Sequence, residues 1–225
     1  MRYGESAFDI LYLWIAIVSG IYILKKRTDT KGRLMGSSVL ILGIGDAFHL
    51  VPRVLNYFVE ADFNSWLGMG KCITSITMTI FYVCLYMLYL KLYHVDRNAR
   101  RDCLIYILAT VRVMVCLLPQ NRWLENESSV LWGTLRNIPF VMLGALIVMF
   151  YFQKRKEIRA FRDVWLYVTL SFLFYIPVAV GAGILPILGM LMLPKTICYI
   201  LLIGAFVRYI KDGETSNGKE ASRKE

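Results

Sequence analysis

Three side chains suited to proton transfer or anion binding lie close together in the sequence: Asp46, His49 and Arg53. Their spacing places them on one face of a helix, because successive helical residues are about 100° apart. A carboxylic acid removed from water can keep its proton near neutral pH, so Asp46 and His49 are candidate catalytic residues for acid–base chemistry. The alternative, which we favour, is a structural role in which Asp46 only neutralises His49, Arg53 or Arg112.

Four further cations interrupt long apolar segments and, with Arg53, predict a binding site for an anion. They are Lys71, Arg112, Arg136 and Lys195. A cation at the centre of a membrane-spanning helix costs about 2.5–3.5 kcal/mol, so it needs a partner, a route to the headgroups or a wet cavity. Few acids are available as partners, because Asp46 is the only carboxylate deep in an apolar segment. We therefore predict a cavity that binds a carboxylate or a phosphate through bidentate guanidinium contacts.

Polar side chains on the other apolar segments complete the candidate site. In a membrane bundle such side chains turn toward the interior. The candidate ligand-binding residues are therefore Arg53, Lys71, Arg112, Arg136, Asn137, Tyr175, Lys195 and Tyr199. Counting along each segment at about 1.5 Å per residue places the five cations in the same half of the membrane. The rival explanation is that each long side chain reaches the headgroups on its own.

These residues belong to a chain with the composition of a membrane protein. It has 225 residues, of which 57% are hydrophobic, and a mean hydropathy of +0.53, which leaves too little polar surface for an ordinary soluble domain. A helical span needs about 20 mostly apolar residues. Seven segments qualify: 8–24, 34–58, 66–89, 103–118, 131–152, 164–185 and 188–210. The sequence predicts an all-α, polytopic bundle of seven transmembrane helices in residues 1–211 and a disordered cytoplasmic tail in residues 212–225.

The basic residues beside these segments predict the orientation, because lysine and arginine are retained on the cytoplasmic side. Nineteen of them follow the first, third, fifth and seventh segments, against Arg2 and Arg122 on the other side. We expect the N-terminus outside, the C-terminus in the cytoplasm, a site that faces outward, and location in the plasma membrane. The net charge of +10 does not indicate nucleic acid, because no stacking platform or binding motif accompanies it. These charges set the topology and contact anionic membrane lipids.

Metal and cofactor chemistry is not indicated by the sequence. His49 and His94 are the two histidines, too few for a multi-histidine metal site. The five cysteines show neither CxxC spacing nor pairs in loops. We therefore predict no metal site and no cofactor.

Two short motifs mark the second and third apolar segments. The first is Gly45-Asp46-Ala47-Phe48-His49-Leu50-Val51-Pro52, and the second is Leu67-Gly68-Met69-Gly70, which opens a tyrosine-rich segment. Together they resemble the YhhN-type lysoplasmalogenase family. The resemblance implies hydrolysis of the vinyl ether of a lysophospholipid, with Asp46 as a catalytic acid. The chain departs from that family in two ways. The family's second intramembrane Asp has no counterpart where this chain reads Leu173-Phe174-Tyr175-Ile176-Pro177. The family also typically has eight spans.

Three functions follow as alternatives. In the first, the protein binds an anionic amphiphile, phospholipid-like or lysolipid-like, in an outward-facing cationic pocket. The second adds hydrolysis of that lipid. The third is a transporter or receptor for a small organic anion, although the sequence shows no clear inverted repeat of the kind found in transporters.

Overall fold

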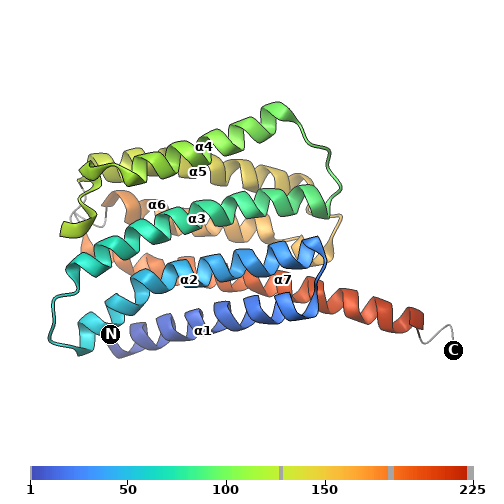
Figure 1. The fold of residues 1–225 in the computed structure, drawn as a ribbon, viewed down its shortest axis with the longest axis horizontal. Helices are drawn as coiled ribbons and strands as arrows, with labels where there is room; N and C mark the ends of the chain where they lie inside the picture. The colour runs from blue at the N-terminus through green and yellow to red at the C-terminus, as the bar shows by residue number, and fades with distance from the viewer. Residues whose placement is uncertain (1, 127–128, 182–184, 222–225) are drawn as a thin grey trace.

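In the computed structural model of the protein, the described residues form seven long α-helices that pack as a bundle (Figure 1). The structure describes residues 2–126, 129–181 and 185–221. Within these ranges the helices are α1 (Arg2–Lys26), α2 (Thr30–Phe58), α3 (Asn64–Leu92), α4 (Ala99–Leu117), α5 (Val130–Gln153), α6 (Val164–Gly181) and α7 (Met192–Ala221). Short 3-10 helices lie in the connections: η1 (Pro119–Asn121), η2 (Trp123–Glu125), η3 (Arg159–Phe161) and η4 (Pro186–Leu191).

The described helices have the length and composition of membrane spans. Six of them qualify separately, namely α1, α2, α3, α5, α6 and α7. The helix α4 qualifies only together with the η1–η2 segment, from which it is separated by a bend of 67°. The reason is its charge, since Arg100, Arg101, Asp102 and Arg112 all fall within its 19 residues. The predicted all-α polytopic membrane bundle is confirmed, and the described residues contain six helices long and apolar enough to span a membrane, or seven if α4 and η1–η2 form one span.

The last helix differs from its predicted boundary. It continues to Ala221, beyond the predicted span 188–210, while the disordered tail in residues 212–225 stays a prediction. Residues 211–221 contain no proline, and extending an existing helix avoids the cost of nucleating a new one. Residues 222–225 of the predicted tail lie outside the described part of the chain.

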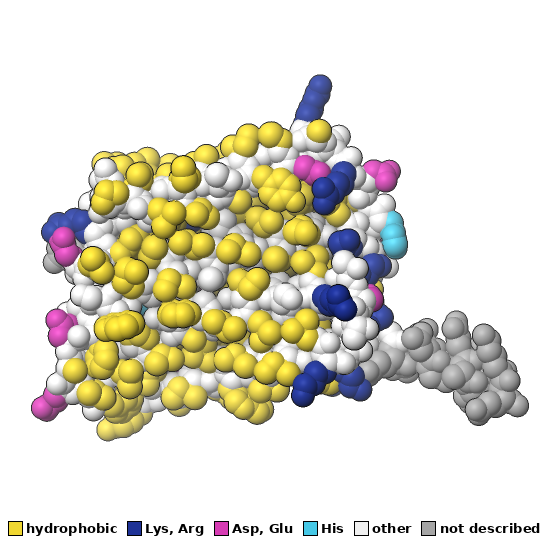
Figure 2. Space-filling view, viewed as in Figure 1, with side chains coloured by type: hydrophobic (Ala, Val, Ile, Leu, Met, Phe, Trp, Pro, Cys, Tyr) yellow, Lys and Arg dark blue, Asp and Glu magenta, His cyan; other side chains and the backbone are white. Residues whose placement is uncertain are grey.

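Helices that follow one another in sequence pack side by side, and α7 also contacts α1 and α2, which closes the bundle. The helix α3 contacts α2, α4 and α5 and carries a long buried face that includes Phe81, Tyr82, Leu85 and Tyr86. Hydrophobic side chains cover the visible flank between the two ends (Figure 2), as expected for a surface that faces lipid. Most of the lysine and arginine side chains visible in Figure 2 gather at the end from which α7 projects.

Two glycines let α2 and α3 approach closely. A Cβ atom at Gly70 would lie 2.7 Å from the Cα atom of His49, and one at Gly45 would lie 2.0 Å from Oγ1 of Thr77. Small residues at such crossings allow membrane helices to pack backbone against backbone. The two glycine-containing motifs therefore fix the part of α2 that carries Asp46 and His49 against α3.

Candidate functional site

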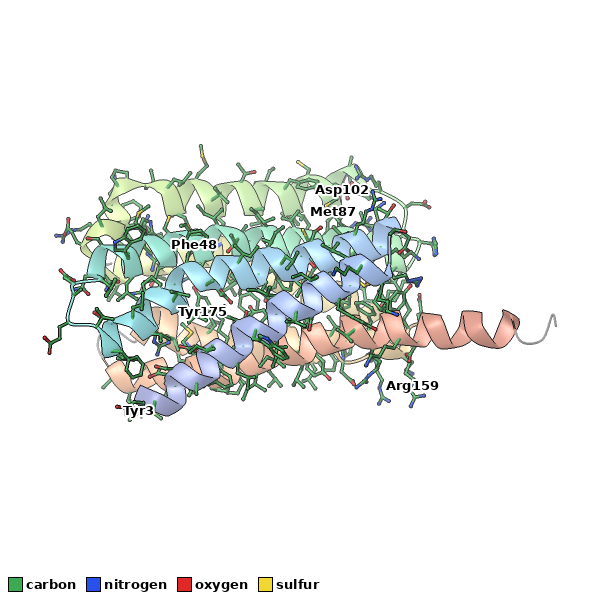
Figure 3. The ribbon with its side chains drawn as sticks, turned by 60° about the horizontal axis from the view of Figure 1, so that its bottom comes forward. Tyr3, Phe48, Met87, Asp102, Arg159 and Tyr175 are labelled. Atoms are coloured by element: carbon green, nitrogen blue, oxygen red, sulfur yellow. The ribbon has the colours of Figure 1, made fainter. Side chains whose placement is uncertain are left out.

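A cavity of about 450 Å³ lies at the end of the bundle where α1, α3, α5 and α7 begin. Nine of the ten residues named from the sequence line it: Asp46, His49, Arg53, Lys71, Arg112, Arg136, Asn137, Tyr175 and Lys195. The tenth, Tyr199, does not line the cavity, but its ring centroid lies 5.6 Å from the Lys195 ammonium. Figure 3 shows Tyr175 toward this end of the bundle, whereas Asp102 and Arg159 lie toward the other.

Arg53 is paired with acids from α1. Its guanidinium group forms a salt bridge with Glu5, and its Nη1 atom lies 4.0 Å from Oδ2 of Asp9. Glu5 also accepts a hydrogen bond from the Tyr57 hydroxyl at 3.1 Å. The expectation that few acids are available for pairing is therefore wrong at Arg53. Because α1 packs along α2, its first turns bring both carboxylates to the depth of this side chain.

Asp46 has a partner that was not among the candidate residues. Its Oδ2 atom accepts a hydrogen bond of 2.5 Å from the hydroxyl group of Tyr12 on α1, and Tyr12 is 1% exposed. Within the described residues no salt bridge joins His49 to a carboxylate, and its Nδ1 atom is buried without a hydrogen-bond partner. Asp46 and His49 therefore line one cavity without forming a salt bridge to each other.

Arg112 is a buried cation held by neutral groups. It is 1% exposed, donates a hydrogen bond to the main-chain carbonyl oxygen of Arg136, and has its Cζ atom 5.0 Å from the ring centroid of Phe140. Its Nε atom is buried without a hydrogen-bond partner, and no described carboxylate forms a salt bridge with it. Burying a charge without an opposite charge is costly. This residue therefore combines a full positive charge with unused hydrogen-bonding capacity in the cavity lining.

The η1–η2 segment supplies lining residues that sequence reasoning missed. Arg136 donates a hydrogen bond of 3.0 Å to Oδ1 of Asn121, and its Cζ atom lies 4.3 Å from the ring centroid of Trp123. Asn121 and Trp123 in turn donate to the carbonyl oxygens of Val115 and Cys116, each at 2.7 Å. These bonds satisfy the carbonyl groups that the end of α4 leaves without helical donors. The segment after α4 therefore folds back onto its own helix and holds Arg136.

Two lysines complete the lining from α3 and α7. Lys71 is exposed, and its Nζ atom donates a hydrogen bond of 2.6 Å to Oδ1 of Asn126. The Lys195 ammonium lies 4.8 Å from the ring centroid of Tyr175, a cation–π distance. Tyr175 donates a hydrogen bond of 2.7 Å to Oδ1 of Asn137. The cationic lining thus extends across the cavity from α3 and α5 to α7.

The described lining of the cavity has a surplus of positive charge. Six cations line it: Arg53, Lys71, Arg112, Arg122, Arg136 and Lys195. Among the described residues, the acids in or against the lining are Asp9, Asp46, Glu5 on Arg53 and Glu125 on Arg122. Six cations against four carboxylates leave a formal charge of +2 among these side chains. Much of the remaining wall is apolar and includes Met78, Phe140, Val178, Met192 and Leu193.

Comparisons of the chain with protein-family models, with curated proteins and with solved structures found no match. The resemblance to YhhN-type lysoplasmalogenases therefore rests on the two sequence motifs and stays a prediction. Among the described residues no group of histidine, cysteine and acidic side chains is arranged to hold a metal ion.

Proposed function

We propose that the protein binds an anionic amphiphile, phospholipid-like or lysolipid-like, in the cationic cavity. The observation that carries this proposal is the buried guanidinium group of Arg112, which lines the cavity without a carboxylate partner in the described residues. Arg112 and Arg136 lie on the adjacent helices α4 and α5. Guanidinium groups form bidentate hydrogen bonds with phosphate and carboxylate, so this pair is suited to an anionic headgroup.

The apolar part of the lining favours an amphiphile over a small organic anion. Val178 and Val180 on α6, and Met192 and Leu193 on α7, line the same cavity as the cations. Val180 is also 45% exposed. Contact with an acyl chain would contribute about 25 cal/mol per Å² of apolar surface removed from water. An anion without a hydrocarbon tail gains nothing from this wall.

The cavity belongs, in this proposal, to the outer half of the membrane. Its end of the bundle is opposite the end where basic side chains gather (Figure 2), and basic residues are retained on the cytoplasmic side. The ligand would therefore come from the outer leaflet or from outside the cell.

Native mass spectrometry of protein extracted with its own lipids tests this function. We expect a co-purifying anionic lipid that is lost from an Arg112→Gln variant. Arg100→Gln is the matched control, because Arg100 is an exposed residue on the same helix, near its other end. Retention of the lipid by Arg112→Gln would contradict the proposal. Wild-type protein that binds a tailless anion but no lipid would instead support a transporter or receptor for a small organic anion.

Hydrolysis of the bound lipid is a second candidate function, favoured by the place of Asp46 in the cavity lining. A catalytic acid must reach the scissile vinyl ether, which lies just below the headgroup of a lysoplasmalogen. Asp46 shares the cavity with the cations that would hold this headgroup. The activity requires that Asp46 deliver a proton, so it is tested by replacing this carboxyl group with an amide.

A further inference from the structure

Two carboxyl groups line the cavity together with the cations. Asp46 accepts a hydrogen bond from Tyr12, and no cation in the described part of the chain forms a salt bridge with it. Asp9 is 4% exposed, and its Oδ2 atom lies 4.0 Å from Nη1 of Arg53. The charge of Asp9 is thus partly compensated by Arg53, whereas the hydrogen-bond donor to Asp46 within the described residues is the neutral hydroxyl group of Tyr12.

An anion in this cavity meets both attraction and repulsion. Charges that line one cavity of about 450 Å³ interact more strongly than charges in bulk water, because the surrounding protein has a low dielectric constant. The guanidinium groups of Arg112 and Arg136 attract a phosphate, and an ionised Asp46 repels it. Protonation of Asp46 removes this repulsion and turns the carboxylate into a group that can donate a hydrogen bond to a phosphate oxygen.

We infer that binding of an anionic headgroup in the cavity is coupled to the uptake of a proton by Asp46. This inference rests on the proposed function, since it concerns the same site. Linkage requires the coupling to be reciprocal, so protons must strengthen anion binding as much as the anion strengthens proton binding. The affinity therefore rises as the pH falls, by up to about tenfold per pH unit when one proton is taken up.

Asp46 has charged and titratable neighbours on each helix that packs against α2. These are Asp9 and Tyr12 on α1, Lys71 on α3, Lys195 and Tyr199 on α7, and His49 and Arg53 on α2 itself. Among them His49 also strengthens anion binding when it gains a proton, because it becomes a cation. The experiment must therefore separate Asp46 from His49.

Isothermal titration calorimetry of the detergent-solubilised protein with lysophosphatidylglycerol provides the test. The phosphodiester group of this probe keeps one negative charge from about pH 5 to about pH 8, so it takes up no proton itself. Titrations in buffers with different enthalpies of ionisation give the number of protons taken up per ligand. We expect wild-type protein to take up close to one proton at the pH where binding is most pH-dependent.

Variants identify the residue that takes up this proton. Asp46→Asn should abolish the uptake and hold the affinity near its low-pH value at every pH. Asp102→Asn is the matched control, because Asp102 accepts a hydrogen bond from a tyrosine, Tyr86, at the opposite end of the bundle (Figure 3). It should keep the uptake of the wild type. Tyr12→Phe, which keeps the carboxyl group, should retain the uptake and move the pH profile to higher pH, since ionised Asp46 loses a donor.

Three results would overturn the inference while leaving the proposed function intact. They are binding without proton uptake in the wild type, undiminished uptake in Asp46→Asn, and loss of uptake in His49→Gln but not in Asp46→Asn. Absence of binding at every pH would have a different meaning, because the proposed function itself would then fail. The test does not depend on the folding of Asp46→Asn. Proton uptake by the wild type and the shifted pH profile of Tyr12→Phe decide it without that variant.

Discussion

Arg112 donates a hydrogen bond to the main-chain carbonyl oxygen of Arg136. The link joins α4 to α5 through a side chain and a backbone atom, and the Arg136 guanidinium group remains directed at Asn121 and Trp123. Two guanidinium groups are therefore brought to one cavity. The neutral carbonyl acceptor of Arg112 can be exchanged for a phosphate without leaving a described carboxylate unpaired.

Replacing Arg112 or Arg136 with glutamine should weaken binding of an anionic lysolipid by about 1.5–3 kcal/mol, the range for hydrogen bonds to charged groups. Calorimetric titration of each purified variant measures this loss. Arg112→Lys should recover part of it, because lysine keeps the charge but not the bidentate geometry. Unchanged affinity in both glutamine variants would show that Arg112 and Arg136 extend to the headgroups of the surrounding bilayer and do not bind the ligand.

Asp46→Asn distinguishes a hydrolase from a binding protein. An amide keeps the shape of the carboxyl group but cannot deliver a proton, so an enzyme should lose lysoplasmalogen turnover by about 100-fold or more and still bind the lipid. A binding protein or transporter should show no turnover in either form. Product release followed by mass spectrometry decides between them, and a wild-type protein inactive on every lysolipid would exclude the hydrolase.

Gly70→Ala should destabilise the bundle, because the added Cβ atom would lie 2.1 Å from the carbonyl oxygen of Phe48. Overpacking of this kind costs about 1–3 kcal/mol, measurable as a lower Tm in detergent. Gly204→Ala makes the same change on α7, where no atom lies within 4 Å of the new methyl group. It should be neutral or stabilising by up to about 1 kcal/mol. Equal Tm values for the two variants would contradict the close approach of α2 and α3.

The predicted orientation is tested by cysteine labelling in intact cells. A cysteine at Asn64, an exposed residue at the start of α3, should react with a membrane-impermeant thiol reagent. A cysteine at Ser216 should react only after the cells are opened. Labelling of Ser216→Cys in intact cells would contradict the predicted orientation and indicate that the cavity lies on the cytoplasmic side.

Much of the cavity lining could be predicted, because helical periodicity and depth determine where a side chain on an apolar span points. Arg53, Arg112 and Lys195 lie on different helices, yet counting residues placed all three in the same half of the membrane, and all three line the cavity. Tyr199 was placed on the correct helix face but does not reach the cavity. It lies one turn further into α7, where its ring packs beside Lys195.

The partners of these side chains could not be predicted in the same way. Periodicity within α2 says nothing about which helix packs beside it, so Tyr12 as the donor to Asp46 and Glu5 as the partner of Arg53 were missed. Asn121 and Trp123 were not predicted for another reason. Their positions depend on hydrogen bonds to the end of α4 and on contact with Arg136, which are tertiary interactions.

The short length of α4 has a consequence for the surrounding bilayer. It has 19 residues, whereas its neighbour α3 has 29, a difference of about 15 Å at the rise of an α-helix. A bilayer adapts to a short span by becoming thinner beside it. The hydrophobic thickness should therefore be smaller along α4, the helix that carries Arg112, than along α3, and lipid headgroups next to α4 should lie deeper than those next to α3.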